Sequence, residues 1–187
     1  MRSRDEIKRF LHDRELSMVG MVERARRFAF FAHDGQKDRG GKSYLEHVTH
    51  VASETDKRYG EEVLTAIAYM HDTVEDGGFT ISDLTAYFPS VVWKVVEILT
   101  RDKAMDRAVY IDKISQNLLA SKVKLIDLEH NMDMSRLPYV KQSDYDRQDR
   151  YASEHRIILD SLIDMEKHMT DYEMQPDVYE EFYMEKK

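Results

Sequence analysis

The sequence contains no cysteine among its 187 residues, and this absence excludes disulfide bonds and thiolate metal sites. Any metal site must therefore use histidine and carboxylate ligands. A chain without cysteine suits a reducing compartment, and we expect a cytoplasmic protein. Glycine and proline are also scarce, with 7 and 3 residues. Because an all-β chain needs many turns, the shortage of both residues favours helices.

No hydrophobic run approaches the roughly 20 residues of a membrane span. The opening stretch, MRSRDEIKRFLHDRELS, is charged throughout and lacks the apolar region of a signal peptide. The formal net charge is −8, and no run of Lys or Arg resembles a patch that binds nucleic acid. We therefore expect neither a membrane nor a nucleic acid as partner. A phosphate-bearing ligand would have to be held by a few placed cations or by a metal.

Hydrophobic periodicity and capping residues predict an all-α protein, an irregular helical bundle. Ser17 is the expected N-cap of the second helix, and a glycine follows the second and the third. We expect one domain over residues 1–169, with its core over 18–168, and a C-terminal appendage over 170–187. The expected helices span residues 4–14, 18–34, 44–59, 61–72, 80–88, 90–100, 109–120, 122–137 and 143–169.

The segment HDTVED gathers acceptor groups at the end of the most apolar helix. His71 and Asp72 follow the run VLTAIAYM, and Glu75 and Asp76 each lie four residues later. If the last helical turn persists, this spacing places the pairs on one face. Acidic groups there repel one another and oppose the helix dipole, and no cation stands beside them in the sequence. A bound divalent metal is the simplest source of compensating charge.

Two residues elsewhere could complete such a site. His47 lies at the edge of the apolar face of its helix, and Asp127 lies among apolar residues in VKLIDLEHNM, with Asn131 one turn later. The alternative for Asp127 is a structural role, as an acceptor for an N–H group or as an ion-pair partner. Mixed His and carboxylate ligands suit Mn, Fe or Zn better than Ca or Mg. Gly77 and Gly78 are expected to end the helix and keep the mouth of the pocket open.

These residues carry a family resemblance. The order His47, His71-Asp72 and Asp127 resembles the H…HD…D signature of the HD-domain metal-dependent phosphohydrolases. HDTVED resembles, more narrowly, the hydrolase domain of the RelA/SpoT family and its small stand-alone relatives, which remove pyrophosphate from the 3′ position of (p)ppGpp. The resemblance covers roughly residues 20–137 and includes FAFFAHDGQKDRGGKSYLEHVTHVA, FTISDLTAYFPSVVWKVVEILTRDK and VKLIDLEHNM.

The sequence departs from the family pattern at three places. Val48 replaces the proline that commonly follows the first metal histidine, Asp38-Arg39 replaces an Arg-Lys pair in the basic loop, and Leu128-Glu129 replaces Arg-Leu. These positions lie near the nucleotide in the family, so they bear on guanine preference. The family's synthetase domain would not fit in the remaining residues, and we therefore expect a hydrolase without synthetase activity.

The resemblance implies a role for each candidate residue. One divalent metal, expected to be Mn²⁺, would be held by His47, His71, Asp72 and Asp127. Glu75 and Asp76 would orient or deprotonate the attacking water. The expected contacts to a small nucleotide substrate are Lys37, Arg39, Lys42, Tyr44 and Asn131. The sequence leaves open whether the chain forms a homo-oligomer.

Two other functions stay open. A related HD phosphohydrolase could act on another nucleotide, such as the 2′-phosphate of NADPH. The chain could also be a metal-binding regulatory protein without turnover. Loss of turnover usually removes metal ligands or the acidic pair, and this sequence keeps all six of those residues, which favours an enzyme.

Overall fold

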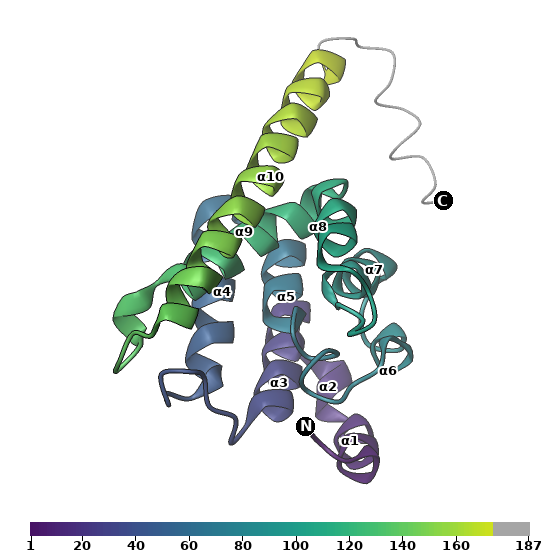
Figure 1. Ribbon diagram of the computed structural model, residues 1–187. Helices are drawn as coiled ribbons and strands as arrows, with labels where there is room; N and C mark the ends of the chain where they lie inside the picture. The colour runs from purple at the N-terminus through teal and green to yellow at the C-terminus, as the bar shows by residue number, and fades with distance from the viewer. Residues whose placement is uncertain (174–187) are drawn as a thin grey trace.

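The computed structural model of the protein describes residues 1–173, and within them it contains helices and no strand (Figure 1). This confirms the predicted all-α class. The α-helices are α1 Arg4–Leu11, α2 Glu15–Met18, α3 Met21–His33, α4 Tyr44–Tyr59, α5 Glu62–Met70, α6 Ile81–Thr85, α7 Ser90–Leu99, α8 Arg107–Ser115, α9 Leu118–Met132 and α10 Gln142–Glu173, with a short 3-10 helix, η1, at Met134–Arg136.

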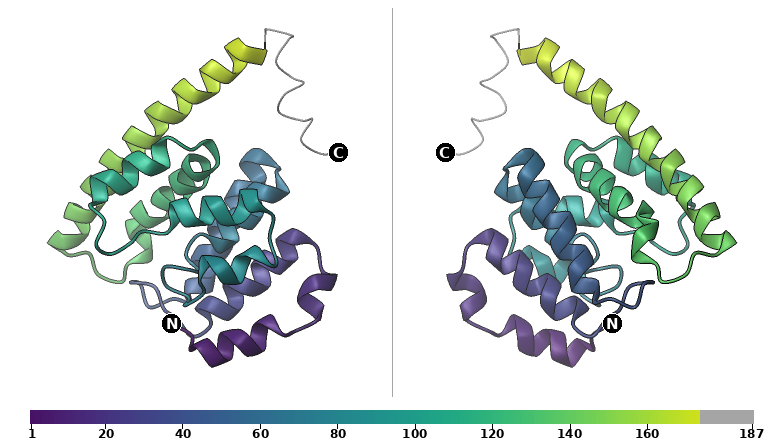
Figure 2. Two further views of the ribbon diagram at one scale, coloured as in Figure 1. Left: turned by 90° about the vertical axis from the view of Figure 1, so that its right-hand side faces the viewer. Right: turned by 90° about the vertical axis from the view of Figure 1, so that its left-hand side faces the viewer.

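Helix α5 lies at the centre of the bundle. It packs against α3 and α4 over most of its length and against α7 and α9 at its other side (Figures 1 and 2). Most of its apolar side chains, among them Leu64, Ile67 and Met70, are fully buried. A helix that is apolar nearly all round is expected to occupy such a central position. The end of α5 therefore delivers His71 and Asp72 into the interior of the protein.

An aromatic cluster fixes the segment that follows HDTVED. The rings of Phe28 and Phe79 lie 5.0 Å apart, and Phe10 of α1 stacks on Phe31 at 4.4 Å. Ile7 and Leu16 are fully buried as well, so the packed core includes side chains that precede residue 18. The cluster ties α1, α3 and the chain after HDTVED together.

Several predicted helix boundaries were wrong, at the ends of 4–14, 109–120 and 122–137 and at the start of 18–34, and two of them have a clear physical cause. Ser17 is not the N-cap of α3, because it lies in α2 and donates its hydroxyl to the Arg14 carbonyl, while α3 begins after Gly20. The break between α8 and α9 comes at residues 116–117, where the Asn117 side chain accepts the N–H of Ala120. Asparagine competes with the helical backbone for hydrogen bonds and therefore favours a cap at this point.

The two glycines after HDTVED serve close packing. A Cβ on Gly77 would lie 2.5 Å from the Thr73 carbonyl oxygen and 2.6 Å from the Ala32 Cβ. Gly78 has a φ of +91°, and a Cβ there would lie 2.8 Å from the Arg2 carbonyl oxygen. Among the described residues neither glycine lines the pocket reported below. The expectation that they keep its mouth open was therefore wrong.

Helix α10 packs against α8 and α9, and its C-terminal half extends beyond the rest of the bundle (Figures 1 and 2). It continues to Glu173, past the expected boundary at residue 169. Residues 174–187 lie outside the described residues, so the C-terminal appendage stays a prediction. Within residues 1–173 no helix combines the length and the apolar character that a membrane span requires.

Candidate metal centre and active site

The structure brings all four predicted metal ligands together. His47 Nε2 lies 3.2 Å from Asp127 Oδ1, 3.3 Å from His71 Nε2 and 3.8 Å from Asp72 Oδ2. His71 Nε2 lies 3.1 Å from Asp72 Oδ2 and 3.8 Å from Asp127 Oδ1. His47 comes from α4, His71 and Asp72 follow α5, and Asp127 comes from α9. Because these helices pack against one another, residues far apart in the sequence meet at one point.

The donor set fits a divalent metal. His71 Nδ1 lies 2.7 Å from the Ala68 carbonyl oxygen. A carbonyl can only accept, so Nδ1 carries the proton and Nε2 faces the cluster. Metal-binding histidines usually make such a hydrogen bond through the nitrogen that does not bind the metal. His47, His71 and Asp127 are all buried, and one ligand atom from each lies within 4.8 Å of the other two.

A lysine lies beside Asp127, a predicted ligand outside the HDTVED segment. Lys124 Nζ lies 2.7 Å from Asp127 Oδ2, so Asp127 also takes the ion-pair role that was weighed as its alternative. The two roles use different oxygens, because Oδ1 faces His47 and accepts a hydrogen bond from Asn131 at 2.6 Å. Lys124 precedes Asp127 by three residues, a spacing that places both on one helical face and could have revealed the pair.

The cluster shifts the pKa values of its members in opposite directions. Burial favours the neutral acid, but Lys124, His47 and His71 hold the pKa of Asp127 well below its usual range. Burial also disfavours a charged imidazole, yet Asp72 and Asp127 raise the pKa of His71 to about 9. In the metal-free protein His71 therefore carries a proton near neutral pH, and a metal must displace it.

Glu75 and Asp76 lie beside the ligands. The Asp76 N–H donates to the Asp72 carbonyl at 3.0 Å, so one helical turn persists beyond Met70. Glu75 is half-buried, and its Oε2 accepts the N–H of Arg101 at 2.9 Å. Desolvation and the charge on Asp72 raise the pKa of both carboxyl groups above the usual values. Within residues 1–173 neither carboxylate forms an ion pair, and both are more basic than surface acids.

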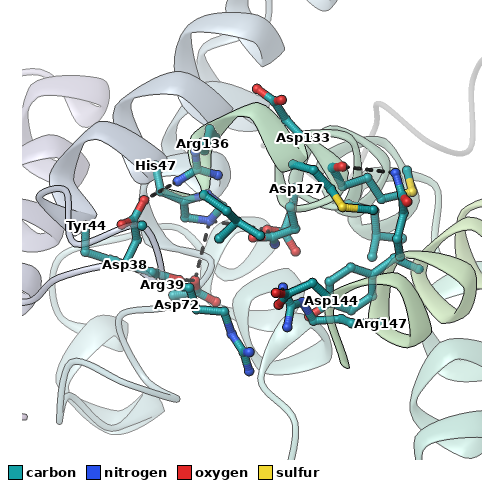
Figure 3. Close-up of a pocket in the computed structure, with 18 of the residues that line it drawn as sticks. Asp38, Arg39, Tyr44, His47, Asp72, Asp127, Asp133, Arg136, Asp144 and Arg147 are labelled. Atoms are coloured by element: carbon teal, nitrogen blue, oxygen red, sulfur yellow. Dashed lines mark hydrogen bonds and ion pairs between the residues drawn. The ribbon is translucent and has the colours of Figure 1, made fainter. Parts of the chain in front are cut away.

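A polar pocket of about 350 Å³ opens onto the ligand cluster (Figure 3). Lys37, Arg39, Tyr44 and Asn131 line it, as predicted for substrate contacts. The Tyr44 hydroxyl donates to Asp72 Oδ2, so this residue also orients a predicted ligand. Among the residues that the structure describes, Lys42 is exposed and does not line the pocket.

Several cations of the pocket wall were not recognised from the sequence. Arg147 of α10 enters the pocket paired with Asp144 at 2.6 Å (Figure 3). On a long polar helix an arginine of this kind carries no signal that separates it from solvated surface. The remaining cations that were missed are Arg101, Arg107, Lys124 and Arg136.

The departures from the family pattern lie in different surroundings. Asp38 and Leu128 line the pocket. Val48 is fully buried in the core. Glu129 pairs with Arg58 at 2.5 Å and, in the part of the chain that the structure describes, lies outside the pocket lining. Together with Arg39, which also lines the pocket, Asp38 and Leu128 are therefore the departures that can touch a ligand.

Comparison with known proteins finds relatives but no matching family model. The chain is 32% identical over 123 residues to a GTP pyrophosphokinase rsh of Brucella ovis, and this alignment covers 60% of this chain and 16% of that protein. It is 31% identical over 153 residues to a GTP pyrophosphokinase of Streptomyces coelicolor, covering 75% of this chain and 17% of that protein. A probable guanosine-3′,5′-bis(diphosphate) 3′-pyrophosphohydrolase of Synechocystis is 28% identical over 123 residues, covering 60% of this chain and 16% of that protein. The chain thus matches about a sixth of the length of each of these relatives.

A solved structure shares the fold. It is described as a metazoan ortholog of SpoT that hydrolyses ppGpp and plays a role in starvation responses. The alignment has a TM-score of 0.64 with 22% sequence identity and covers 77% of this chain and 86% of that one. Together the sequence relatives and the shared fold confirm the resemblance that the motifs indicated: this chain has an all-α fold like that of the SpoT ortholog, and over the matched region its sequence is similar to RelA/SpoT proteins.

Proposed function

We propose that this protein is a metal-dependent phosphohydrolase that removes the 3′-pyrophosphate from (p)ppGpp. The proposal rests on the convergence of two imidazole nitrogens and two carboxylates beside a polar pocket whose walls include lysine and arginine side chains. The Synechocystis relative is named for this reaction, and the structural relative is described as a ppGpp hydrolase. We propose residues 1–169 as the domain that performs it.

In this proposal His47, His71, Asp72 and Asp127 hold one divalent metal, with Mn²⁺ as the expected ion. A divalent metal supplies a Lewis acid for a phosphoryl oxygen and makes hydroxide available at neutral pH. Hydrogen bonds to other residues orient two of these proposed ligands independently of the metal. The Ala68 carbonyl fixes the tautomer of His71, and the Tyr44 hydroxyl fixes the orientation of Asp72.

Glu75 and Asp76 act on the attacking water. The Arg101 N–H occupies Glu75 Oε2 and leaves Oε1 free to accept a proton. Partial burial raises the pKa of Glu75, which brings it closer to neutrality and makes it a better base at physiological pH. Water attacks the phosphorus attached to the 3′ oxygen, on the side opposite that oxygen, and gives up a proton to Glu75 or Asp76. The bond between this phosphorus and the 3′ oxygen breaks, the 3′ oxygen takes up a proton, and pyrophosphate and the nucleotide with a free 3′-hydroxyl are released.

The pocket walls supply the contacts for the rest of the nucleotide. Lys37 and Arg39 lie on the loop between α3 and α4, where they can meet the base or the 5′-phosphates. Asn131 donates one amide N–H to Asp127 and keeps its other groups for a ribose hydroxyl or a phosphate. Lys42 is the weakest of the proposed contacts, because it is exposed outside the pocket lining.

A product assay tests the proposal. The protein is incubated with Mn²⁺ and ppGpp, and GDP and pyrophosphate are measured together. Parallel reactions contain NADPH, which would release inorganic phosphate, and GTP with ATP, which would report pyrophosphoryl transfer. We expect GDP and pyrophosphate in equal amounts and no transfer. Phosphate from NADPH without turnover of ppGpp would assign the site to the other nucleotide, and no turnover of either would favour a regulatory protein.

A further inference from the structure

Arg136 connects the metal centre to the loop that carries Lys37 and Arg39. Its Nη2 donates to Asp38 Oδ2 at 2.6 Å, as Figure 3 shows, and its Nη1 lies 2.8 Å from His130 Nδ1 and 3.0 Å from the His130 carbonyl oxygen. The side chains of both Arg136 and Asp38 are largely buried, with 17% and 8% of their surfaces exposed. One guanidinium therefore holds two parts of the pocket wall.

The contact between Arg136 and His130 decides which nitrogen of His47 carries the proton. A guanidinium has donors only, so His130 Nδ1 must be the acceptor. His47 Nδ1 lies 2.7 Å from the same atom and must then be the donor. His47 therefore carries its proton on Nδ1 and turns Nε2, as a possible ligand, toward His71 and Asp127.

Two further features keep this arrangement in place. The His130 ring stacks on His50, with the ring centres 4.1 Å apart, which restrains its rotation. The loop also passes very close to η1, because a Cβ on Gly40 would lie 2.3 Å from the Arg136 carbonyl oxygen. Only glycine allows this approach, so the backbone of the loop and the side chain of Asp38 are both pressed toward Arg136.

We propose that Arg136, anchored by Asp38, is a positioning residue that presents His47 to the metal through His130 and locks the substrate loop onto the metal centre. The proposal rests on the metal site proposed above. This proposal also explains Asp38, which stands where the family pattern has a cation: its carboxylate binds the guanidinium of Arg136. Groups that orient a metal-binding histidine typically change metal affinity about 10- to 100-fold when removed.

The first experiment compares Arg136→Met with wild type in the absence of nucleotide. We expect a Mn²⁺ dissociation constant raised about 10- to 100-fold by calorimetry. With Zn²⁺ as a diamagnetic probe, nitrogen NMR should show the Nδ1-bound proton of His47 in the wild type and its loss or broadening in the variant. A merely structural role for Arg136 would move neither signal while helical content is retained. Unchanged metal affinity together with an unchanged His47 signal would overturn the proposal.

Arg58→Met is the matched control. Arg58 forms an arginine–carboxylate pair with Glu129, the neighbour of His130, and within residues 1–173 it does not contact the candidate metal ligands. It should leave Mn²⁺ affinity and the His47 signal unchanged. If Arg136→Met does not fold, Asp38→Asn and Arg136→Lys keep part of the network and should weaken Mn²⁺ binding to an intermediate extent. Wild-type affinity in both would also overturn the proposal.

These measurements separate this proposal from the proposed reaction. Metal affinity and the His47 signal do not depend on which nucleotide is hydrolysed. If ppGpp is not a substrate, the positioning role of Arg136 can still be observed. If His47 in the wild type carries no proton on Nδ1, the positioning role fails even when ppGpp is hydrolysed.

Discussion

Lys124 should compete with the metal for the charge of Asp127. The two side chains form a nearly buried ion pair, with 14% of Lys124 and 5% of Asp127 exposed. In Lys124→Met the stem volume is kept and the charge is lost, so Asp127 is left as a buried carboxylate without its lysine. Removing one partner of a buried pair costs about 3–5 kcal/mol, and we expect about 3 kcal/mol because Lys124 is not fully buried.

A bound divalent metal should replace most of this lost charge. With the metal present we expect Lys124→Met to cost about 1 kcal/mol, close to the value of one hydrogen bond. By the thermodynamic cycle, the difference of about 2 kcal/mol appears as tighter metal binding by roughly thirtyfold. The variant should thus be less stable than the wild type without metal and bind Mn²⁺ more tightly.

Urea unfolding in EDTA and in saturating Mn²⁺ measures both quantities. Lys122→Met is the control, since Lys122 lies on the same helix with 13% of its side chain exposed but pairs with the exposed Glu166. Its cost should be small and equal with and without metal. An equal loss of stability for Lys124→Met in EDTA and in Mn²⁺ would refute the idea that lysine and metal share Asp127.

Four further outcomes are expected. His71→Ala should reduce bound metal and abolish hydrolysis, as a chelator should in the wild type. Glu75→Gln and Asp76→Asn should lower kcat by about 10²–10⁴ at unchanged metal content, and normal rates would remove them from the mechanism. Arg39→Ala should raise KM for ppGpp more than it lowers kcat, whereas an unchanged KM would place Arg39 on the solvated surface. Mn²⁺ affinity should rise by up to about tenfold per pH unit until the pH passes the pKa of His71, about 9, because the metal must displace the His71 proton. Without metal, the stabilisation of the fold by protonated His71 should be lost as the pH rises toward that pKa.

Much of the fold could be predicted from local patterns. The apolar run before His71 marks a central helix, and glycines with positive φ follow α3 and α4 as expected. The errors lie at polar residues that can either cap a helix or continue it, such as Asn117, which caps α9. Such choices depend on which backbone groups the surrounding packing leaves unpaired, and a single sequence does not contain that information.

The cluster of candidate metal ligands could be predicted because its residues violate the pattern around them. Asp127 stands out as a carboxylate among apolar residues, and His71-Asp72 stand out at the end of an apolar helix. Arg107 and Arg147, which also line the pocket, stand out nowhere, because cations on polar helices resemble ordinary solvated surface. A candidate functional residue can be recognised from the local sequence when its polarity differs from that of its neighbours in the helix. It cannot be recognised when only its tertiary contacts are unusual.

The pair of Asp38 and Arg136 shows how far this limit extends. The two residues are separated by 98 positions, and each is unremarkable in its own segment. From the sequence alone Asp38 weakens a basic loop by placing an anion where a cation is usual. In the folded chain Asp38 forms an ion pair with Arg136, which neutralises its charge and holds the loop against the segment that contains Arg136 and His130. Among the described pocket residues, Lys37, Arg39 and Arg101 have no ion pair and supply the positive charge that a substrate can meet. Counting Asp38 against the cations of the loop therefore underestimates this positive charge.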